Sequence, residues 1–368
     1  MNNATDILKN RTAEKEGLIH LLRTGDPEER AAIFTAAGRA MRENTACSVS
    51  LRGLIELSNI CSKNCCYCGI RSGNRAVDRY LLDSHSVMKA AVYAWQQGFG
   101  SIVIQSGERT DRAFTSHITQ LLEHIGKSCR HELGITLSCG EQSEAVYREW
   151  LEAGAQRYLL RIETSDPALY RKLHPNNKLH SFSRRTDALR TLQRLGYQTG
   201  TGVMVGLPFQ GVEQLAGDLL FMKESDIDMV GMGPYIPHPD TPLFRYRDEI
   251  PDATSRLELS LRMIALLRIM MPDINIAAST AMQALDERGR IRAIEAGANV
   301  FMPNLTPASE ASNYMLYEGK PVSGDMAADI LAGFERETAA LGLKVNYGQQ
   351  GNSKHYYRRM AAIKNPVP

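Results

Sequence analysis

Short apolar runs alternate along most of the chain with longer segments that carry apolar residues at helical spacing. The runs predict strands because they are short and bounded by glycine or polar residues. We expect eight strands, at residues 54–57, 101–105, 134–138, 156–163, 199–206, 228–233, 275–279 and 299–302. The intervening segments predict helices at residues 84–97, 111–127, 143–153, 167–173, 181–195, 211–224, 252–270, 285–296 and 323–340.

This alternation predicts an α/β fold, because strands separated by helices pair in parallel through right-handed crossovers. Eight strand-helix units indicate a closed (β/α)8 barrel of the TIM type. Two more helices, at residues 13–23 and 26–44, precede the first strand and predict an N-terminal helical extension. We expect the extension over residues 1–50, the barrel over 51–345 and a C-terminal tail over 346–368.

The composition is that of an ordinary folded chain, with 43% hydrophobic residues, 23% charged residues and a formal net charge of +2. This balance gives no reason to expect nucleic acid or a membrane surface as a partner. No apolar run approaches the roughly 20 residues of a spanning helix. Seven thinly spread cysteines and the lack of a signal-peptide pattern favour a reducing, cytoplasmic location.

One loop carries the clearest chemistry. Cys61, Cys65 and Cys68 directly follow the first predicted strand. Three thiolates can bind three irons of a 4Fe–4S cluster and leave the fourth iron open, which favours chemistry over a structural role. Cys66 is out of register and is expected to be a packed thiol.

Two other uses of the cysteines fit less well. A zinc site usually takes four ligands in two pairs, and the remaining cysteines form no second pair. They are Cys47, Cys129 and Cys139. A disulfide framework is disfavoured by the odd cysteine number.

A barrel places function at the carboxyl ends of its strands, and polar side chains recur there. Arg161 and Glu163 lie two residues apart and point to the same side; beside Leu159 and Leu160 they are expected to be buried and to contact a ligand. His238 lies between two prolines, and the sequence leaves two interpretations open: the residue shapes the rim of the site, or it takes part in function. Further candidates at strand ends are Gln105, Ser106, Gly107, Glu108, Thr136, Ser138, Glu141, Met204, Ser279, Thr280, Met282 and Met302.

The cysteine loop, with Tyr67 before its last cysteine, resembles the signature of radical S-adenosylmethionine (SAM) enzymes. Several other segments are similar to the HydE family of FeFe-hydrogenase maturases within that superfamily. They are residues 58–71, 105–108, 161–167, 204–208, 231–242, 278–282 and 297–304. The resemblance runs from about residue 55 to about residue 320.

The resemblance implies one 4Fe–4S cluster held by the three cysteines, and SAM as the source of a 5′-deoxyadenosyl radical. Members with a second cluster carry late cysteines, and this chain has none after Cys139. The residues implied to bind SAM are Tyr67, Gln105, Ser106, Gly107, Glu163, Arg185 and Met204. Those implied to face the substrate are Gln105, Thr136, Arg161, Ser279, Thr280, Met302 and Tyr314.

The resemblance further implies a role in assembling the diiron cofactor of FeFe-hydrogenase. The expected substrate is a small molecule, a cysteine-bound iron carbonyl cyanide species, and the expected partners are the other maturases and an electron donor such as a ferredoxin or flavodoxin. An amino-acid mutase resembling methylornithine synthase (PylB-like) is the alternative within the superfamily. A non-enzymatic metal-binding scaffold is the alternative from a different class.

Overall fold

The chain forms an eight-stranded parallel barrel in a computed structural model that describes residues 14–321 and 328–364. Around the barrel the strands follow the order β10-β1-β2-β3-β4-β5-β7-β9. A parallel bridge between Ala277 and Val300 joins the two ends of this order and closes the barrel. The strands are β1 (Ser48–Ser58), β2 (Ser101–Ser106), β3 (Gly134–Ser138), β4 (Ala155–Leu159), β5 (Gln198–Thr201), β7 (Met229–Val230), β9 (Asn275–Ile276) and β10 (Val300–Phe301). The predicted α/β barrel is confirmed.

Helices cover the outside of the barrel. Side chains of Asp83, Asp111 and Ser143 accept hydrogen bonds from backbone N–H groups of the first helical turns, which explains where three of the helices begin. The covering helices are α4 (Ser84–Gln96), α5 (Arg112–Ser128), α6 (Glu144–Glu152), α8 (Phe182–Leu195), α9 (Val212–Glu224), α10 (Ala253–Met270) and α12 (Gly289–Glu295).

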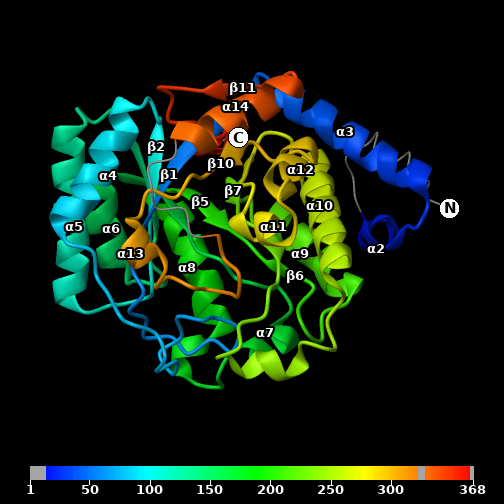
Figure 1. The fold of residues 1–368 in the computed structure, drawn as a ribbon, viewed down its shortest axis with the longest axis horizontal. Coiled ribbons are helices and arrows are strands. Elements are labelled where there is room, and N and C mark those ends of the chain that lie inside the picture. The colour runs from blue at the N-terminus through cyan, green and yellow to red at the C-terminus, as the bar shows by residue number, and fades with distance from the viewer. Residues whose placement is uncertain (1–13, 322–327, 365–368) are drawn as a thin grey trace.

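Short elements occupy the loops between the strands and helices. They are α7 (Pro167–Leu173), α11 (Thr280–Leu285), α13 (Ala308–Ala311), the 3-10 turns η1 (Lys178–His180) and η2 (Pro242–Tyr246), and the strand pair β6 (Met204–Val205) and β8 (Gly233–Pro234). Figure 1 shows α7 and the loop after β1 at the lower end of the barrel, opposite β11 and α14.

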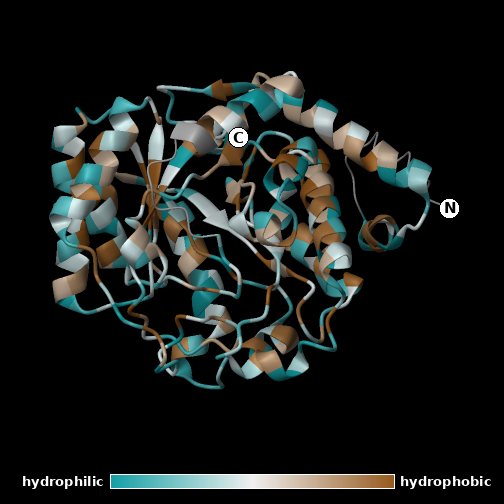
Figure 2. Cartoon of the chain, in the orientation of Figure 1, coloured by the Kyte–Doolittle hydropathy of each residue, from teal (hydrophilic) through white to brown (hydrophobic). Residues whose placement is uncertain are grey.

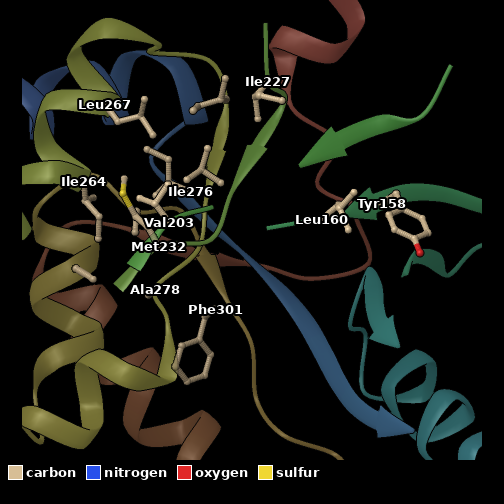
Figure 3. Close-up of a cluster of buried hydrophobic side chains, with 14 of the residues drawn as sticks. Tyr158, Leu160, Val203, Ile227, Met232, Ile264, Leu267, Ile276, Ala278 and Phe301 are labelled. Carbon is tan, nitrogen blue, oxygen red and sulfur yellow. The ribbon is translucent and has the colours of Figure 1, made fainter. Parts of the chain in front are cut away.

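The core lies between the strands and the helices around them. Ile264 and Leu267 of α10 pack toward Ile276, Val203 and other strand residues (Figure 3). Figure 2 shows hydrophobic residues concentrated at the strands and hydrophilic residues on the outer helix faces. No helix of residues 14–321 and 328–364 has the length and hydropathy needed to cross a membrane.

The chain ends flank the barrel. Helix α2 (Lys15–Arg23) packs on α9, and α3 (Pro27–Thr45) packs on α10 (Figure 1). After α14 (Ala328–Ala340), strand β11 (Lys344–Asn346) pairs with the start of β1. Helix α15 (Lys354–Lys364) follows; His355 and Arg359 bind the buried Asp228 carboxylate at 3.0 and 2.6 Å.

Several element boundaries differ from the sequence-based prediction. Strand β1 begins at Ser48 instead of Leu54, because Ser50 and Arg52 are buried inside the barrel where a local pattern reads polar residues as exposed. The loop expected after residue 279 contains helix α11. The segment after 346 contains helix α15, which was not predicted. The predicted helix starts at residues 13 and 323 lie outside the described residues.

Asp218 on α9 gives the fold a pH-dependent contribution to stability. Its carboxyl group is fully buried and accepts hydrogen bonds from Ser165 N at 2.5 Å and Ser165 Oγ at 2.7 Å. Burial raises its pKa to about 7. The folded chain therefore holds a proton that the unfolded chain releases near pH 4, so stability is present at low pH and is lost as pH rises from about 4 to about 7.

We expect Asp218→Asn to remove most of this dependence, since the amide keeps the acceptor oxygen and cannot ionise. The difference in the free energy of unfolding between pH 5 and pH 8, measured with urea, is expected to be smaller than in the wild type by up to about 2–3 kcal/mol. The exposed Asp187→Asn variant serves as control. An unchanged pH difference in Asp218→Asn contradicts the assignment.

Candidate active site

The loop that carries the cysteines is held in shape by one arginine. The Arg79 guanidinium donates to four backbone carbonyls, those of Asn59, Ile70, Arg71 and Asn74, at 2.6 to 2.9 Å. A guanidinium group carries five N–H donors in a fixed planar geometry, so Arg79 can hold these carbonyls in place although the loop has no regular secondary structure. The loop is therefore pre-formed at the carboxyl end of β1.

Cys61, Cys65 and Cys68 line one cavity at this end of the barrel. Burial raises the pKa of all three thiols: that of Cys65 rises to about 12, and that of Cys68 rises well above its ordinary value. Negative charge on Cys61 raises the pKa of Cys65 and of Cys68 further. The backbone N–H of Glu108 donates to Cys61 Sγ at 3.3 Å. Deprotonation here needs a bound positive charge, which iron supplies.

The described thiols do not form a site for a single metal ion. Within residues 14–321 and 328–364, no three His, Cys, Asp or Glu side chains gather around one point as the ligands of a single ion do. A 4Fe–4S cluster does not require such a point, because each cysteine binds a different iron.

Four buried charges lie beneath the cysteine loop. Lys63 Nζ, between the cysteines in sequence, lies 3.1 Å from Glu108 Oε1 and 3.4 Å from Glu141 Oε2. Arg185 Nε lies 2.9 Å from Glu141 Oε1. Burial raises the pKa of Glu108, against the opposing effect of Arg185 and Lys63. Two cations balance two anions, and together they tie the loop to the ends of β2 and β3 and to α8.

Gly107 allows the β2 end to approach the cysteine loop. A side chain there would place its Cβ 2.4 Å from the Ile60 carbonyl oxygen and 2.8 Å from Cys61 Cβ. Both distances are too short for any residue with a Cβ. The Gly107 N–H instead donates to the Ser58 carbonyl at 2.8 Å.

Arg161 and Glu163 form an ion pair at 2.9 Å on the cavity wall. Glu163 has φ of 65°, a left-handed conformation that is uncommon for a residue with a side chain. Burial raises the pKa of Glu163, and the Arg161 charge opposes that rise. A strained, buried carboxylate beside an arginine is typical of a ligand-binding position.

The cavity has a volume of about 300 Å³. Its lining also holds a second buried ion pair, Lys320 and Glu56, at 2.6 Å. On the same lining, Gln105 Nε2 donates to Tyr314 OH at 3.2 Å. Arg161 Nε and Ser279 Oγ are buried without a hydrogen-bond partner among the described residues, which leaves polar atoms available to a ligand.

Most of the residues proposed from sequence meet in this cavity. Its lining includes Cys61, Cys65, Tyr67, Cys68, Gln105, Ser106, Gly107, Arg161, Glu163, Arg185, Met204, Ser279, Thr280, Met302 and Tyr314. Two of the other strand-end candidates do not line it: Glu141 pairs with Lys63 and Arg185, and Met282 is buried in the hydrophobic core. The third residue outside the lining is Thr136. It lies two residues before Ser138 on β3, one inward-facing layer deeper, and its hydroxyl accepts a hydrogen bond from Arg157 Nε at 3.1 Å.

The structure also shows the surroundings of Arg185 and His238, two residues considered from the sequence. The Arg185 guanidinium is already engaged by Glu141, so it does not present a free fork to the cavity. The His238 ring is buried outside the cavity lining and packs where a Cβ on Gly69 would come within 2.5 Å of it. Its place is that of a rim residue that supports the cysteine loop.

Lys63, Arg79, Glu56 and Lys320 were not among the residues singled out from sequence. The position of Lys63 between two cysteines is a signal that could have identified it. Glu56 and Lys320 are far apart in the chain, and no local pattern connects them.

Comparison with known proteins agrees with this site. The Radical SAM superfamily model matches residues 55–222, and the Biotin and Thiamin Synthesis associated domain model matches residues 234–333. The [FeFe] hydrogenase maturase subunit HydE of Thermotoga maritima is 42% identical over 334 residues, covering 91% of this chain and 89% of that protein. The chain belongs to the HydE family of radical SAM enzymes.

More distant relatives agree on the fold. The 3-methylornithine synthase of Methanosarcina acetivorans is 27% identical over 80% of this chain and 81% of its own length. The crystal structure of methylornithine synthase (PylB) superposes with a TM-score of 0.76 at 23% identity, over 94% of this chain and 97% of that one. The alternative mutase is therefore a more remote match than HydE.

Membership in this family makes the chain an enzyme that uses a 4Fe–4S cluster and SAM. The three thiols that line the cavity, the donated N–H···S bond and the charged groups on the same lining fit both groups. The scaffold alternative is excluded.

Proposed function

We propose that this HydE-family enzyme takes part in the assembly of the diiron active site of FeFe-hydrogenase. The observation that carries the proposal is its 42% identity over 91% of the chain to the HydE maturase of Thermotoga maritima. Its substrate is a small cysteine-bound iron carbonyl cyanide species, its partners are the other hydrogenase maturases, and its setting is the cytoplasm.

Cys61, Cys65 and Cys68 hold the cluster in this proposal. When bound, the cluster supplies the electron that cleaves SAM and releases a 5′-deoxyadenosyl radical. Glu163 would accept hydrogen bonds from the ribose hydroxyls of SAM, and Tyr67, Met204 and the turn at Gly107 would bind and orient SAM beside the cysteine loop. The Arg185 guanidinium orients the carboxylate of SAM while it remains paired with Glu141.

Arg161, Ser279 and Thr280 bind the anionic end of the substrate. Two observations support this role. Arg161 Nε and Ser279 Oγ have no hydrogen-bond partner within residues 14–321 and 328–364, and both residues line the cavity with Thr280. Tyr314 and Tyr317, on the segment that lines the cavity from α13 onward, help exclude water that would quench a radical.

The test is activation of apo-hydrogenase in an anaerobic mixture that contains the two other maturases, with and without this enzyme. Activation is expected to require it. Arg161→Lys is expected to lower activation at least about 10-fold, since it keeps a positive charge beside Glu163 and loses the planar fork that binds an anion. Its iron content and its SAM cleavage in the absence of substrate are expected to stay within about twofold of the wild type.

The matched control is Arg190→Lys, an exposed arginine on α8. Absence of activation together with turnover of lysine to an isomer assigns the mutase function instead. Loss of iron in Arg161→Lys contradicts the place given to Arg161.

A further inference from the structure

Two cations act on Cys66, the half-buried thiol between two of the cysteines assigned to the cluster, and a third cation is adjacent in sequence to a residue bonded to its backbone. The guanidinium groups of Arg71 and Arg245 are close enough to act electrostatically on it, and Lys172 lies next to Leu173, whose carbonyl accepts a hydrogen bond from Cys66 N at 2.9 Å. Over residues 14–321 and 328–364, none of these three side chains forms an ion pair with a carboxylate. Unpaired cations at a surface attract an acidic partner.

Aromatic side chains lie between these cations. Lys172 Nζ lies 4.6 Å from the ring centroid of Phe209, and that ring contacts the Tyr246 ring edge-to-face at 4.7 Å. The Arg245 guanidinium lies 4.6 Å from the Tyr246 ring and donates to its hydroxyl at 2.6 Å. Phe209 is 41% exposed, which is unusual for so large an apolar ring. Aromatic and arginine side chains are enriched in protein interfaces.

This surface is connected directly to the cysteine loop. Leu243 N donates to the Cys66 carbonyl at 3.0 Å, so the chain on both sides of Cys66 is bonded to the segments that carry Lys172 and Arg245. Leu173 and Leu243 belong to a small apolar cluster against which Cys66 and Tyr246 pack. The cysteine loop and the segments that carry Lys172 and Arg245 are therefore joined by backbone hydrogen bonds and by a shared apolar cluster.

We propose that Arg71, Lys172, Phe209, Arg245 and Tyr246, the cysteine-loop patch, dock a small acidic protein that carries one electron. The proposal rests on the proposed function only in that radical SAM chemistry consumes an electron from outside the enzyme. Docking brings the reduced carrier next to the loop; one electron leaves the carrier and enters the oxidised cluster, and no bond forms or breaks. The carboxylates of the carrier pair with the three cations.

The experiment compares two triple variants of the reconstituted enzyme. The patch variant is Arg71→Gln, Lys172→Gln, Arg245→Gln. The control is Arg39→Gln, Lys127→Gln, Lys354→Gln, three exposed cations on α3, α5 and α15 with the same loss of charge. Flavodoxin is the probe, and its Kd for each enzyme is measured by titration calorimetry at low and physiological salt.

We expect the patch variant to bind flavodoxin at least about 10-fold more weakly than the wild type at low salt, with a smaller salt dependence, and the control to bind normally. In flavodoxin-driven SAM cleavage, the KM for flavodoxin is expected to rise while kcat is retained. With dithionite or with reduced methyl viologen, an anionic and a cationic small reductant, the rates of all three enzymes are expected to agree.

If the triple variant does not fold, the single variant Lys172→Glu repeats the test, because the Lys172 side chain is exposed. This variant is also expected to bind flavodoxin more weakly than the wild type. Three results overturn the docking proposal. The control variant binds flavodoxin as weakly as the patch variant does, or the patch variant loses SAM cleavage equally with dithionite and with methyl viologen. In the third, the patch variant binds flavodoxin normally and yet fails to activate hydrogenase. Failure of the wild type to activate hydrogenase, with the flavodoxin effect intact, contradicts the proposed function and leaves the docking proposal standing.

Discussion

Cys65→Ala is expected to leave the enzyme unable to hold its cluster. Reconstituted wild type should bind about four irons per chain, and this variant less than one, because a cluster bound by two thiolates lacks a third protein ligand. SAM cleavage with dithionite is expected to fall at least about 100-fold, equivalent to about 2.7 kcal/mol in the barrier. Iron analysis, the absorbance of the cluster and the yield of 5′-deoxyadenosine measure these effects.

The same loop offers a matched control in Cys66. Its thiol lies one residue further along, packs against the apolar cluster that contains Leu173 and Leu243, and does not line the cavity. Cys66→Ala is expected to keep iron and SAM cleavage within about threefold of the wild type. Equal iron loss in both variants shows that Cys66 is a ligand and that the register assigned to the loop is wrong.

Lys63→Met is expected to destabilise the protein by about 3–5 kcal/mol, because it leaves Glu108 and Glu141 buried with only Arg185 to balance them. The cysteine loop is expected to lose order at the same time, so less iron is retained. The free energy of unfolding of the cluster-free protein in urea separates the loss of stability from the loss of metal.

A double-mutant cycle isolates the charge. Adding Glu108→Gln to Lys63→Met leaves one carboxylate and one guanidinium, so the double variant is expected to recover at least half of the lost stability. The cycle must then show a coupling free energy of about 1.5 kcal/mol or more. Additive losses mean that Lys63 acts through the packing of its aliphatic chain, and the electrostatic account is then wrong.

The fold was predictable in outline because strand and helix periods are properties of neighbouring residues. The run at residues 101–105 and the capped start at Asp111 each lie within one element, and the structure has both where the pattern placed them. The extent of β1 was not predictable in the same way. Ser50 and Arg52 look solvent-facing by local pattern, yet the closing of the barrel buries both.

The candidate site was also predictable only where it depends on residues that are close together in the chain. The spacing of Cys61, Cys65 and Cys68 is contained in one loop, and the carboxyl-end rule for parallel barrels carries Gln105, Glu163 and their counterparts to the same face. Thr136 shows the limit of that rule. A position near the end of a strand does not determine how deep in the barrel the side chain lies. Strand register decides depth, and register depends on pairing with β2 and β4.

By itself the sequence determined the parallel barrel, the three-cysteine loop and the family, because each is encoded by residues that are close together in the chain. Only the tertiary structure decided which charged groups meet: Lys63 with Glu108 and Glu141, Glu56 with Lys320, and Arg71 and Arg245 with the Cys66 thiol. Most of these contacts join residues from segments that are far apart in the chain. They exist only once the barrel has closed, because closure sets the register and brings those segments to one end.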